Sequence, residues 1–146
     1  MKKIAIYIGS FLFIMLNVAF FIPKESKLTE PEKITFFSGD FKQARLQAKK
    51  EKKPIFIDFY ATWCGSCKQL SSKTLTNKEV INILNQNYIN MAIDVDTEEG
   101  AKMAQWYKVT AIPTLVIVDE NGKVMKQTVG FLTSKQFLNF ASIPTK

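Results

Sequence analysis

The sequence contains no histidine and only two cysteines, Cys64 and Cys67. A structural zinc site ordinarily takes four cysteine or histidine ligands, and one copy of this chain cannot supply the usual set. A zinc or copper ion shared between two chains is the alternative that this argument leaves open. We therefore predict no metal site within a single chain.

Arginine-rich runs are also missing, although the net charge is +7. The lysines are scattered, and their one local cluster, residues 49–53, is expected at the end of a helix, where cations suit the negative end of the dipole. Scattered lysines are typical of a solvated basic face rather than of a nucleic-acid surface. We therefore expect no nucleic-acid partner.

Internal repeats and low-complexity segments are absent as well. Aromatic and branched residues continue along the whole chain after Pro31, which excludes the disordered class. The length of 146 residues allows one small domain plus whatever the ends carry.

The first part of the chain is a hydrophobic segment. Residues 4–22 carry no charge, follow Lys2 and Lys3, and are about long enough to span a bilayer as a helix. We interpret residues 1–22 as an uncleaved anchor, with a cleaved signal peptide as the alternative, because only Ala19 near the end suits a cleavage site. Residues 23–33 are polar, contain two prolines, and are interpreted as a linker. Residues 34–146 then form the domain.

Strand and helix patterns alternate along this domain. Strands are expected at 34–38, 54–61, 88–96, 113–119 and 123–130, and helices at 41–52, 64–75, 79–86, 98–108 and 134–141. The residues at 120–122, Glu-Asn-Gly, mark a hairpin between the last two strands. Parallel strands joined by helices, followed by a terminal hairpin, predict a mixed α/β sheet flanked by helices.

Two features of the helices can be assigned in more detail. Ser38 or Asp40 is expected to cap the first helix and Asn77 the third. The expected apolar positions of the first helix are Phe41, Ala44, Leu46 and Ala48.

The two cysteines are separated by two residues at a predicted strand-to-helix junction. A disulfide between them closes almost no loop, so it would add little stability. Redox chemistry, by contrast, suits this spacing. A thiolate at Cys64 is favoured by the free N–H groups at the helix start, and Cys67 lies one turn later, where it can attack a mixed disulfide at Cys64.

With these motifs in place, the chain resembles the thioredoxin-fold thiol:disulfide oxidoreductases from about Ile34 to Ala141. The matching pieces are IDFYATWCGSCK, then DVD after a strand, VTAIPTLVIVDENGKV, and VGFL before the last helix. The N-terminal half of this match also resembles periplasmic thioredoxin-like domains that pass electrons from a membrane reductase. The resemblance implies a bacterial origin, a redox-active Cys64–Cys67 disulfide and no other cofactor.

The resemblance also implies roles for individual residues. Cys64 corresponds to the exposed nucleophile, Cys67 to the buried resolving thiol, and Pro113 to a cis-proline that leaves the Ile112 backbone free to pair with a substrate. Trp63 corresponds to an aromatic that shields the disulfide, with core packing as the simpler interpretation. The remaining expected substrate-binding positions are Gly65 and Ser66 between the cysteines, and Ala111, Ile112, Val129 and Gly130 on an apolar rim.

Asp58 interrupts a strand that is predicted to be buried. Burial should raise the pKa of this carboxyl, which could then act as general base for Cys67. An acid that reaches solvent at a strand end is the alternative. Thioredoxins often place a lysine on the neighbouring strand, and here we assign Asn90 to that position. A second departure is Gly65-Ser66, where the archetype has Gly-Pro.

The expected function follows from the resemblance. We predict a monomeric reductant of disulfide-containing protein substrates, held at the inner membrane by residues 4–22, facing the periplasm or the cell exterior, and fed by a membrane thiol reductase. With signal cleavage it would instead be secreted to the periplasm. A disulfide-forming oxidant or isomerase of the same fold is the first alternative, and a non-catalytic docking or chaperone module is the second.

Overall fold

The computed structural model describes residues 32–142. The predicted anchor or signal at 1–22 and nearly all of the predicted linker therefore lie outside the described residues. Within the part of the chain that the structure describes, no helix is both long and apolar enough to cross a membrane.

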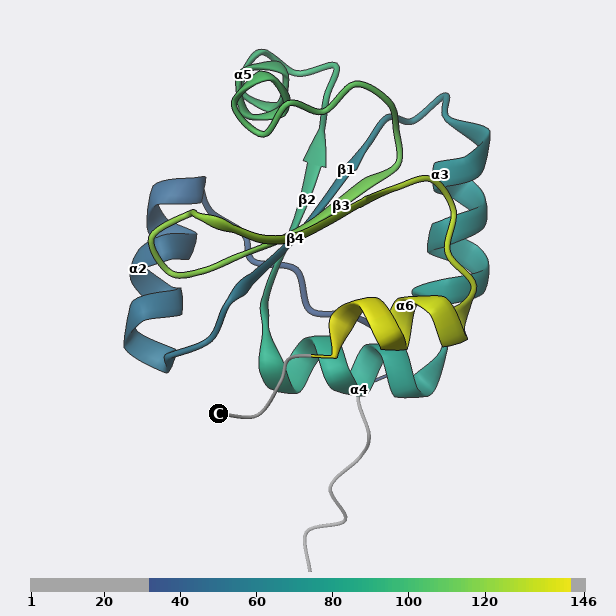
Figure 1. Cartoon of the computed structure of the whole chain (residues 1–146), viewed down its shortest axis with the longest axis horizontal. Coiled ribbons are helices and arrows are strands. Elements are labelled where there is room, and N and C mark those ends of the chain that lie inside the picture. The colour runs from purple at the N-terminus through teal and green to yellow at the C-terminus, as the bar shows by residue number, and fades with distance from the viewer. Residues whose placement is uncertain (1–31, 143–146) are drawn as a thin grey trace, which may run out of the picture.

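The domain is built on a four-stranded sheet in the order β2-β1-β3-β4 (Figure 1). The strands are β1 (Ile55–Tyr60), β2 (Ile89–Asp94), β3 (Thr114–Val118) and β4 (Val124–Val129). β1 pairs with β2 in parallel and with β3 in the antiparallel sense, and β3 and β4 form an antiparallel hairpin. The predicted mixed sheet with a terminal hairpin is thus confirmed.

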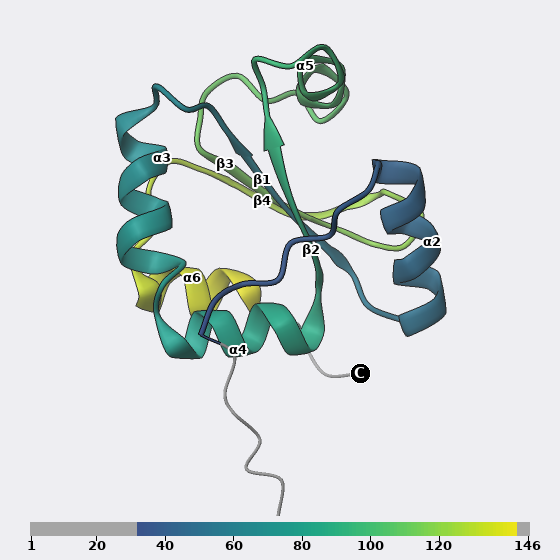
Figure 2. The same ribbon diagram turned by 180° about the vertical axis from the view of Figure 1, so that it is seen from behind.

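Helices cover both faces of the sheet (Figures 1 and 2). The helical elements are α2 (Phe41–Glu51), α3 (Gly65–Gln69), the π-helical turn η2 (Leu70–Thr74), α4 (Lys78–Asn87), α5 (Glu98–Trp106) and α6 (Ser134–Ala141). One view has α2 and α5 on one side of the sheet and α3, α4 and α6 on the other, and the reverse view agrees.

Two apolar cores follow from the alternation of side chains along the strands. Ile55, Ile57 and Phe59 point toward the core that contains Ala44 and Ala48 of α2. Phe56 of the same strand points to the opposite core, with η2, α4 and α6. Asp58, two residues after Phe56, therefore faces the side of the sheet that carries the cysteine-containing helix.

Local signals account for the helix ends. Asp40 caps α2 and forms a capping box with Gln43, and Asn77 caps α4 through bonds to the Glu79 and Val80 amides. These caps agree with the sequence. The assignment of Leu46 to the apolar face of α2 is wrong, because its side chain is 61% exposed.

The strand predicted at 34–38 is also wrong in extent. Only Phe36 forms a bridge, to Asn90 of β2. Side-chain amides make most of the hydrogen bonds here, in place of a regular backbone ladder between strands. The Asn85 side chain accepts from the Thr35 amide and donates to the Lys33 carbonyl. The Asn90 amide nitrogen donates to the Thr35 carbonyl. Residues 33–37 therefore lie along the sheet edge as an irregular strap.

The helix predicted from Cys64 is α-helical only as far as Gln69. α3 continues into the π-turn η2, where the Leu75 amide donates to the Leu70 carbonyl five residues earlier. The hydroxyls of Ser71 and Ser72 both donate back to the Lys68 carbonyl. Such side-chain bonds compete with the regular ladder, which accounts for the wider turn.

Candidate redox site

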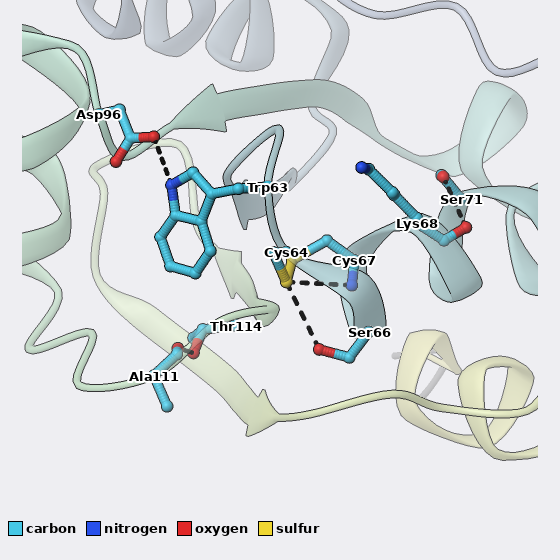
Figure 3. The surroundings of a disulfide bond; sticks show 9 residues. All are labelled: Trp63, Cys64, Ser66, Cys67, Lys68, Ser71, Asp96, Ala111 and Thr114. Carbon is cyan, nitrogen blue, oxygen red and sulfur yellow. Dashed lines mark hydrogen bonds between the residues drawn. A yellow bond between two sulfur atoms is a disulfide. The ribbon is translucent and has the colours of Figure 1, made fainter.

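Cys64 and Cys67 form a disulfide at the junction of β1 and α3 (Figure 3). Their Cα atoms are 5.3 Å apart. Cys64 caps α3 and Cys67 lies inside that helix, so the short connection after β1 places both sulfurs at one end of the sheet. The expected disulfide between these residues is therefore present.

Exposure does not distinguish the two cysteines. Cys64 is 5% exposed and Cys67 is 6% exposed. The expectation of an exposed Cys64 and a buried Cys67 is wrong for the oxidised protein, because both cysteines belong to one buried cluster with Ala61, against which the half-buried Ile112 packs. The asymmetry lies instead in hydrogen bonding. The Cys67 amide donates to Cys64 Sγ at 3.1 Å, and Ser66 Oγ lies 3.4 Å from the same sulfur.

Trp63 stands beside the disulfide (Figure 3). Its side chain is 68% exposed, which excludes the core-packing interpretation. The indole Nε1 donates to Asp96 Oδ2 at 2.7 Å. Asp96 is held in the loop after β2, where its amide donates to Asp94 Oδ1. The sequence motif DVD contains Asp96, but nothing local indicates that it bonds the indole.

The Ile112–Pro113 peptide bond is cis, as the resemblance implied. The Gly130 amide donates to the Pro113 carbonyl at 2.8 Å, and Thr114 pairs with Val129. Two segments far apart in sequence, 111–113 and 129–130, are thereby joined beside the disulfide. Gly130 has φ of 95°, a backbone conformation that favours glycine.

The predicted rim residues differ in exposure. Ala111 is exposed, Val129 is 53% exposed, and Ile112 is half-buried against the disulfide. Gly65 is exposed, with open space where a side chain would stand. Trp63 and these segments thus provide apolar groups on the surface around the buried sulfurs.

Asp58 is buried on β1, as predicted. It is only 7% exposed, and its Oδ1 has no hydrogen-bond partner among the described residues. Burial in this apolar surrounding raises the pKa of Asp58 to about 7. The alternative of an acid that reaches solvent at the strand end does not hold.

The residue beside Asp58 on the neighbouring strand is Ala92, not Asn90 as the sequence suggested. Asn90 pairs with Phe56, one step further along the same face. Its amide nitrogen donates to the carbonyls of Thr35 and Leu84, so it anchors the strap rather than contacting the acid. Ala92 supplies neither charge nor hydrogen bond to Asp58.

A groove of about 730 Å³ opens next to Asp58. Cys67 and Ala92 line this groove together with Asp58, and Phe36 of the strap forms part of its wall. The lining also contains two lysines, Lys33 and Lys68. Asp58 and Cys67 therefore line one groove, although each residue is largely buried.

Metal ligands do not gather within residues 32–142. No group of three or more histidine, cysteine or acidic side chains in that range could hold a metal ion.

Comparison with known proteins places the chain among thioredoxin-like proteins. The thiol:disulfide interchange protein DsbD of Actinobacillus pleuropneumoniae serotype 5b is 31% identical over 102 residues, covering 67% of this chain. This chain matches only 17% of that protein's length, so it corresponds to a small part of it. The thioredoxin of Borreliella burgdorferi is 34% identical over 103 residues, or 68% of this chain and 80% of that thioredoxin.

Solved structures agree with these sequence matches. A candidate disulphide-isomerase from Bacteroides thetaiotaomicron superposes with a TM-score of 0.67 at 31% identity, covering 76% of this chain and 92% of that one. The oxidised C-terminal domain of DsbD from Neisseria meningitidis gives a TM-score of 0.59 at 27% identity, covering 72% of this chain and 95% of that domain. The thioredoxin-like domain family itself matches residues 41–142. This chain therefore belongs to the thioredoxin-like domain family.

Proposed function

We propose that this chain is a thiol:disulfide oxidoreductase that reduces disulfides in proteins outside the cytoplasm. The observation that carries the proposal is the Cys64–Cys67 disulfide whose inner residue, Cys67, shares a groove with the buried acid Asp58. The relatives named as thiol:disulfide interchange proteins support the same chemistry.

In the first step, the Cys64 thiolate attacks one sulfur of a substrate disulfide. A bond forms between Cys64 Sγ and that sulfur, and the other substrate sulfur leaves as a thiolate that takes a proton from solvent. The amide of Cys67 and the hydroxyl of Ser66, which both approach Cys64 Sγ in the disulfide, support the nucleophilic role of Cys64.

In the second step, Cys67 attacks Cys64 Sγ and releases the second substrate sulfur. Cys67 must first lose its proton, and Asp58 in the same groove accepts it. The pKa of Asp58, about 7, suits a general base that works near neutral pH. Two electrons thereby move from the two thiols of the protein to the substrate, and the Cys64–Cys67 bond forms again.

Substrate docking is assigned to the apolar surface around the sulfurs. Trp63, the 111–113 segment with its cis-proline and the 129–130 segment would hold an extended substrate segment, with the Ile112 backbone as a pairing site. The exposure of Trp63 and Val129 supports this assignment, since exposed apolar groups that surround a buried reactive bond are typical of docking surfaces.

For location, we propose that residues 4–22 anchor the domain to the inner membrane with its redox site on the outer side. The uncharged stretch and the preceding lysines support this orientation. A membrane thiol reductase would then return electrons to the disulfide. The similarity to DsbD proteins of several bacteria supports a donor of this class.

An isomerase is the second candidate, and one observation favours it. The structure from Bacteroides thetaiotaomicron, which aligns over 92% of its length, is described as a candidate disulphide-isomerase. Isomerisation would use the same attack by Cys64 but would return the substrate's own thiolate to Cys64 Sγ before Cys67 intervenes.

Two measurements on the full-length chain in mild detergent test the proposal. A reductant should reduce insulin and should have a potential nearer the thioredoxin value, about −270 mV, than the strong-oxidant value, about −120 mV. A potential near the second value would overturn the direction. Reactivation of scrambled ribonuclease that is faster than net insulin reduction would favour the isomerase. Failure in both assays would leave a non-catalytic docking module.

A further inference from the structure

Ser66 lies between the cysteines, and its hydroxyl faces a sulfur rather than open solvent. Ser66 Oγ is 3.4 Å from Cys64 Sγ, and the residue is half-buried. The amide of Cys67 reaches the same sulfur at 3.1 Å. Figure 3 shows the two contacts converging on Cys64 Sγ from one helical turn. Both of these polar contacts therefore go to Cys64 Sγ.

The strength of the Ser66 contact depends on the redox state. A sulfur in a disulfide is a weak acceptor, whereas a thiolate is charged and accepts strong hydrogen bonds. A serine hydroxyl can rotate to donate, and the α3 turn already holds its oxygen close. Reduction of the disulfide thus creates a good acceptor beside a donor that has little need to move.

We propose that Ser66 is a catalytic residue whose hydroxyl donates a hydrogen bond to the Cys64 thiolate in the reduced protein. This inference rests on the proposed function, because it gives a role to the residue between the two reacting cysteines. It assigns Ser66 to the chemistry of the nucleophile and not only to substrate contact.

The electron balance gives the expected direction of the effect. When a donor dithiol reduces the pair, the Cys64–Cys67 bond breaks, the donor's disulfide forms, and two electrons pass to the two sulfurs. Of the two protons that the donor's thiols lose, Cys67 takes up one and solvent takes the other, while Cys64 stays a thiolate. The Ser66 hydroxyl stabilises this product and leaves the disulfide nearly unaffected. The equilibrium constant for reduction rises, and the chain becomes a milder reductant whose Cys64 has a larger thiolate fraction at neutral pH.

Charged groups near the two cysteines would not cause a change in the reactivity of Cys64 in a Ser66 variant. Lys68 lies on the same helical turn, Asp96 bonds Trp63, and Asp58 lies on β1 (Figure 3 shows the first two). All three remain unchanged when Ser66 is replaced. A shift in the behaviour of Cys64 in a Ser66 variant would therefore report the lost hydroxyl.

The test compares Ser66→Ala, Ser66→Thr and Ser72→Ala in the full-length chain in mild detergent. Thr keeps the hydroxyl. Ser72 is the matched control, because its exposed hydroxyl bonds the Lys68 carbonyl on the same helical segment. The readouts are the pH dependence of iodoacetamide alkylation at Cys64 and the equilibrium constant for disulfide reduction by glutathione. Neither requires a protein substrate.

Ser66→Ala should move half-maximal alkylation to higher pH and lower the equilibrium constant about ten- to a hundredfold, as expected when a hydrogen bond to a charged group is lost. Ser66→Thr and Ser72→Ala should match the parent. Unchanged values in Ser66→Ala, or equal losses in Ser66→Ala and Ser66→Thr, would overturn the role of the hydroxyl. An inactive parent in the insulin assay would instead overturn the proposed function and leave these two readouts valid.

Discussion

Asp58 and Ala92 lie directly opposite each other on the parallel strands β1 and β2. The buried carboxyl therefore has a methyl group as its cross-strand neighbour, and burial alone sets the direction of its pKa shift. Because the groove opens at both residues, the side chain at position 92 can reach the carboxyl from the solvent side.

Ala92→Lys should lower the pKa of Asp58 from its value of about 7. A lysine at this position places an ammonium group near the carboxylate and favours its charged form. The pH profile of mixed-disulfide resolution should shift to lower pH. Ala92→Met, which fills similar space without charge, is the control. Identical profiles for the two variants would show that position 92 has no electrostatic contact with Asp58.

Asp58→Asn should slow the release of a trapped partner while sparing the first attack by Cys64. The reason is that only the second step needs a proton acceptor for Cys67. Single-turnover rates with a labelled disulfide peptide, measured separately for formation and decay of the mixed disulfide, check this. If Asp58→Asn and the parent resolve the intermediate at equal rates, Asp58 has a structural role alone.

The same substitution should change the pH dependence of stability in the oxidised protein. Burial raises the pKa of Asp58 from 3.8 to about 7, so between these values the folded protein holds a proton that the unfolded chain releases. The free energy of unfolding of the parent should therefore fall as pH rises through this window and stay low above it. Asp58→Asn should remove that fall and be the more stable protein above neutral pH.

Urea titrations at several pH values between about 3 and 8 measure this difference. The contrast between parent and variant should be smallest near the acidic end, below the unfolded pKa of 3.8, where the carboxyl is mostly protonated in both folded and unfolded states. Stability curves that run parallel across the window would mean that Asp58 titrates normally in the folded protein.

Cys64 should be alkylated before Cys67 in the reduced protein, at a pH below the ordinary cysteine value of about 8.5. The physical reason is the pair of donors around Cys64 Sγ, the Cys67 amide and the Ser66 hydroxyl. Cys67→Ser should accumulate mixed disulfides with partners on Cys64. Equal trapping by Cys64→Ser would contradict the assignment of the two thiols. Mass spectrometry of the trapped species identifies the cysteine involved.

Gly100→Ala should destabilise the fold by about 1–3 kcal/mol, the usual cost of overpacking. A Cβ at Gly100 would lie 1.9 Å from the Asp94 carbonyl oxygen, so α5 and the end of β2 must move apart. The loop between β2 and α5 also carries Asp96, whose carboxylate accepts the hydrogen bond from Trp63. Gly65→Ala, where a Cβ meets nothing within 4 Å, is the stability control. Equal melting temperatures of the two variants would contradict the close approach.

The full chain should sediment with membranes and keep its N-terminal segment. Residues 4–22 are uncharged and follow two lysines, which is the basis of the proposed anchor. Fractionation of expressing cells, together with the intact mass of the protein, checks both points. A soluble product that begins near residue 20 would replace the anchor by a cleaved signal.

Much of this fold could be predicted from sequence because its signals are local. The continuous apolar run of β1, the Glu-Asn-Gly turn before β4 and the caps at Asp40 and Asn77 each depend on neighbours only a few residues away. The spacing of Cys64 and Cys67 is also local, since one helical turn joins them. For these features, periodicity and capping chemistry were enough.

The neighbour of Asp58 was decided by tertiary structure. β1 and β2 are separated by α3, η2 and α4, and no turn connects them to set their register. Ala92 and Asn90 lie on the same face, so alternation could not choose between them. The choice came from long-range contacts, because the Asn90 amide binds the strap that closes the sheet edge.

The residues that can do redox chemistry are recognisable from local patterns: a cysteine pair at a strand-to-helix junction, an acid in an apolar strand, and an Ile-Pro bond ahead of a buried strand. The surroundings of these residues depend on how the whole chain folds. It buried both cysteines to the same degree, bound Trp63 to Asp96, and opened one groove to Asp58 and Cys67. The physical reason is that burial and hydrogen-bond partners depend on chain segments that are distant in sequence, whereas helix caps and strand patterns do not.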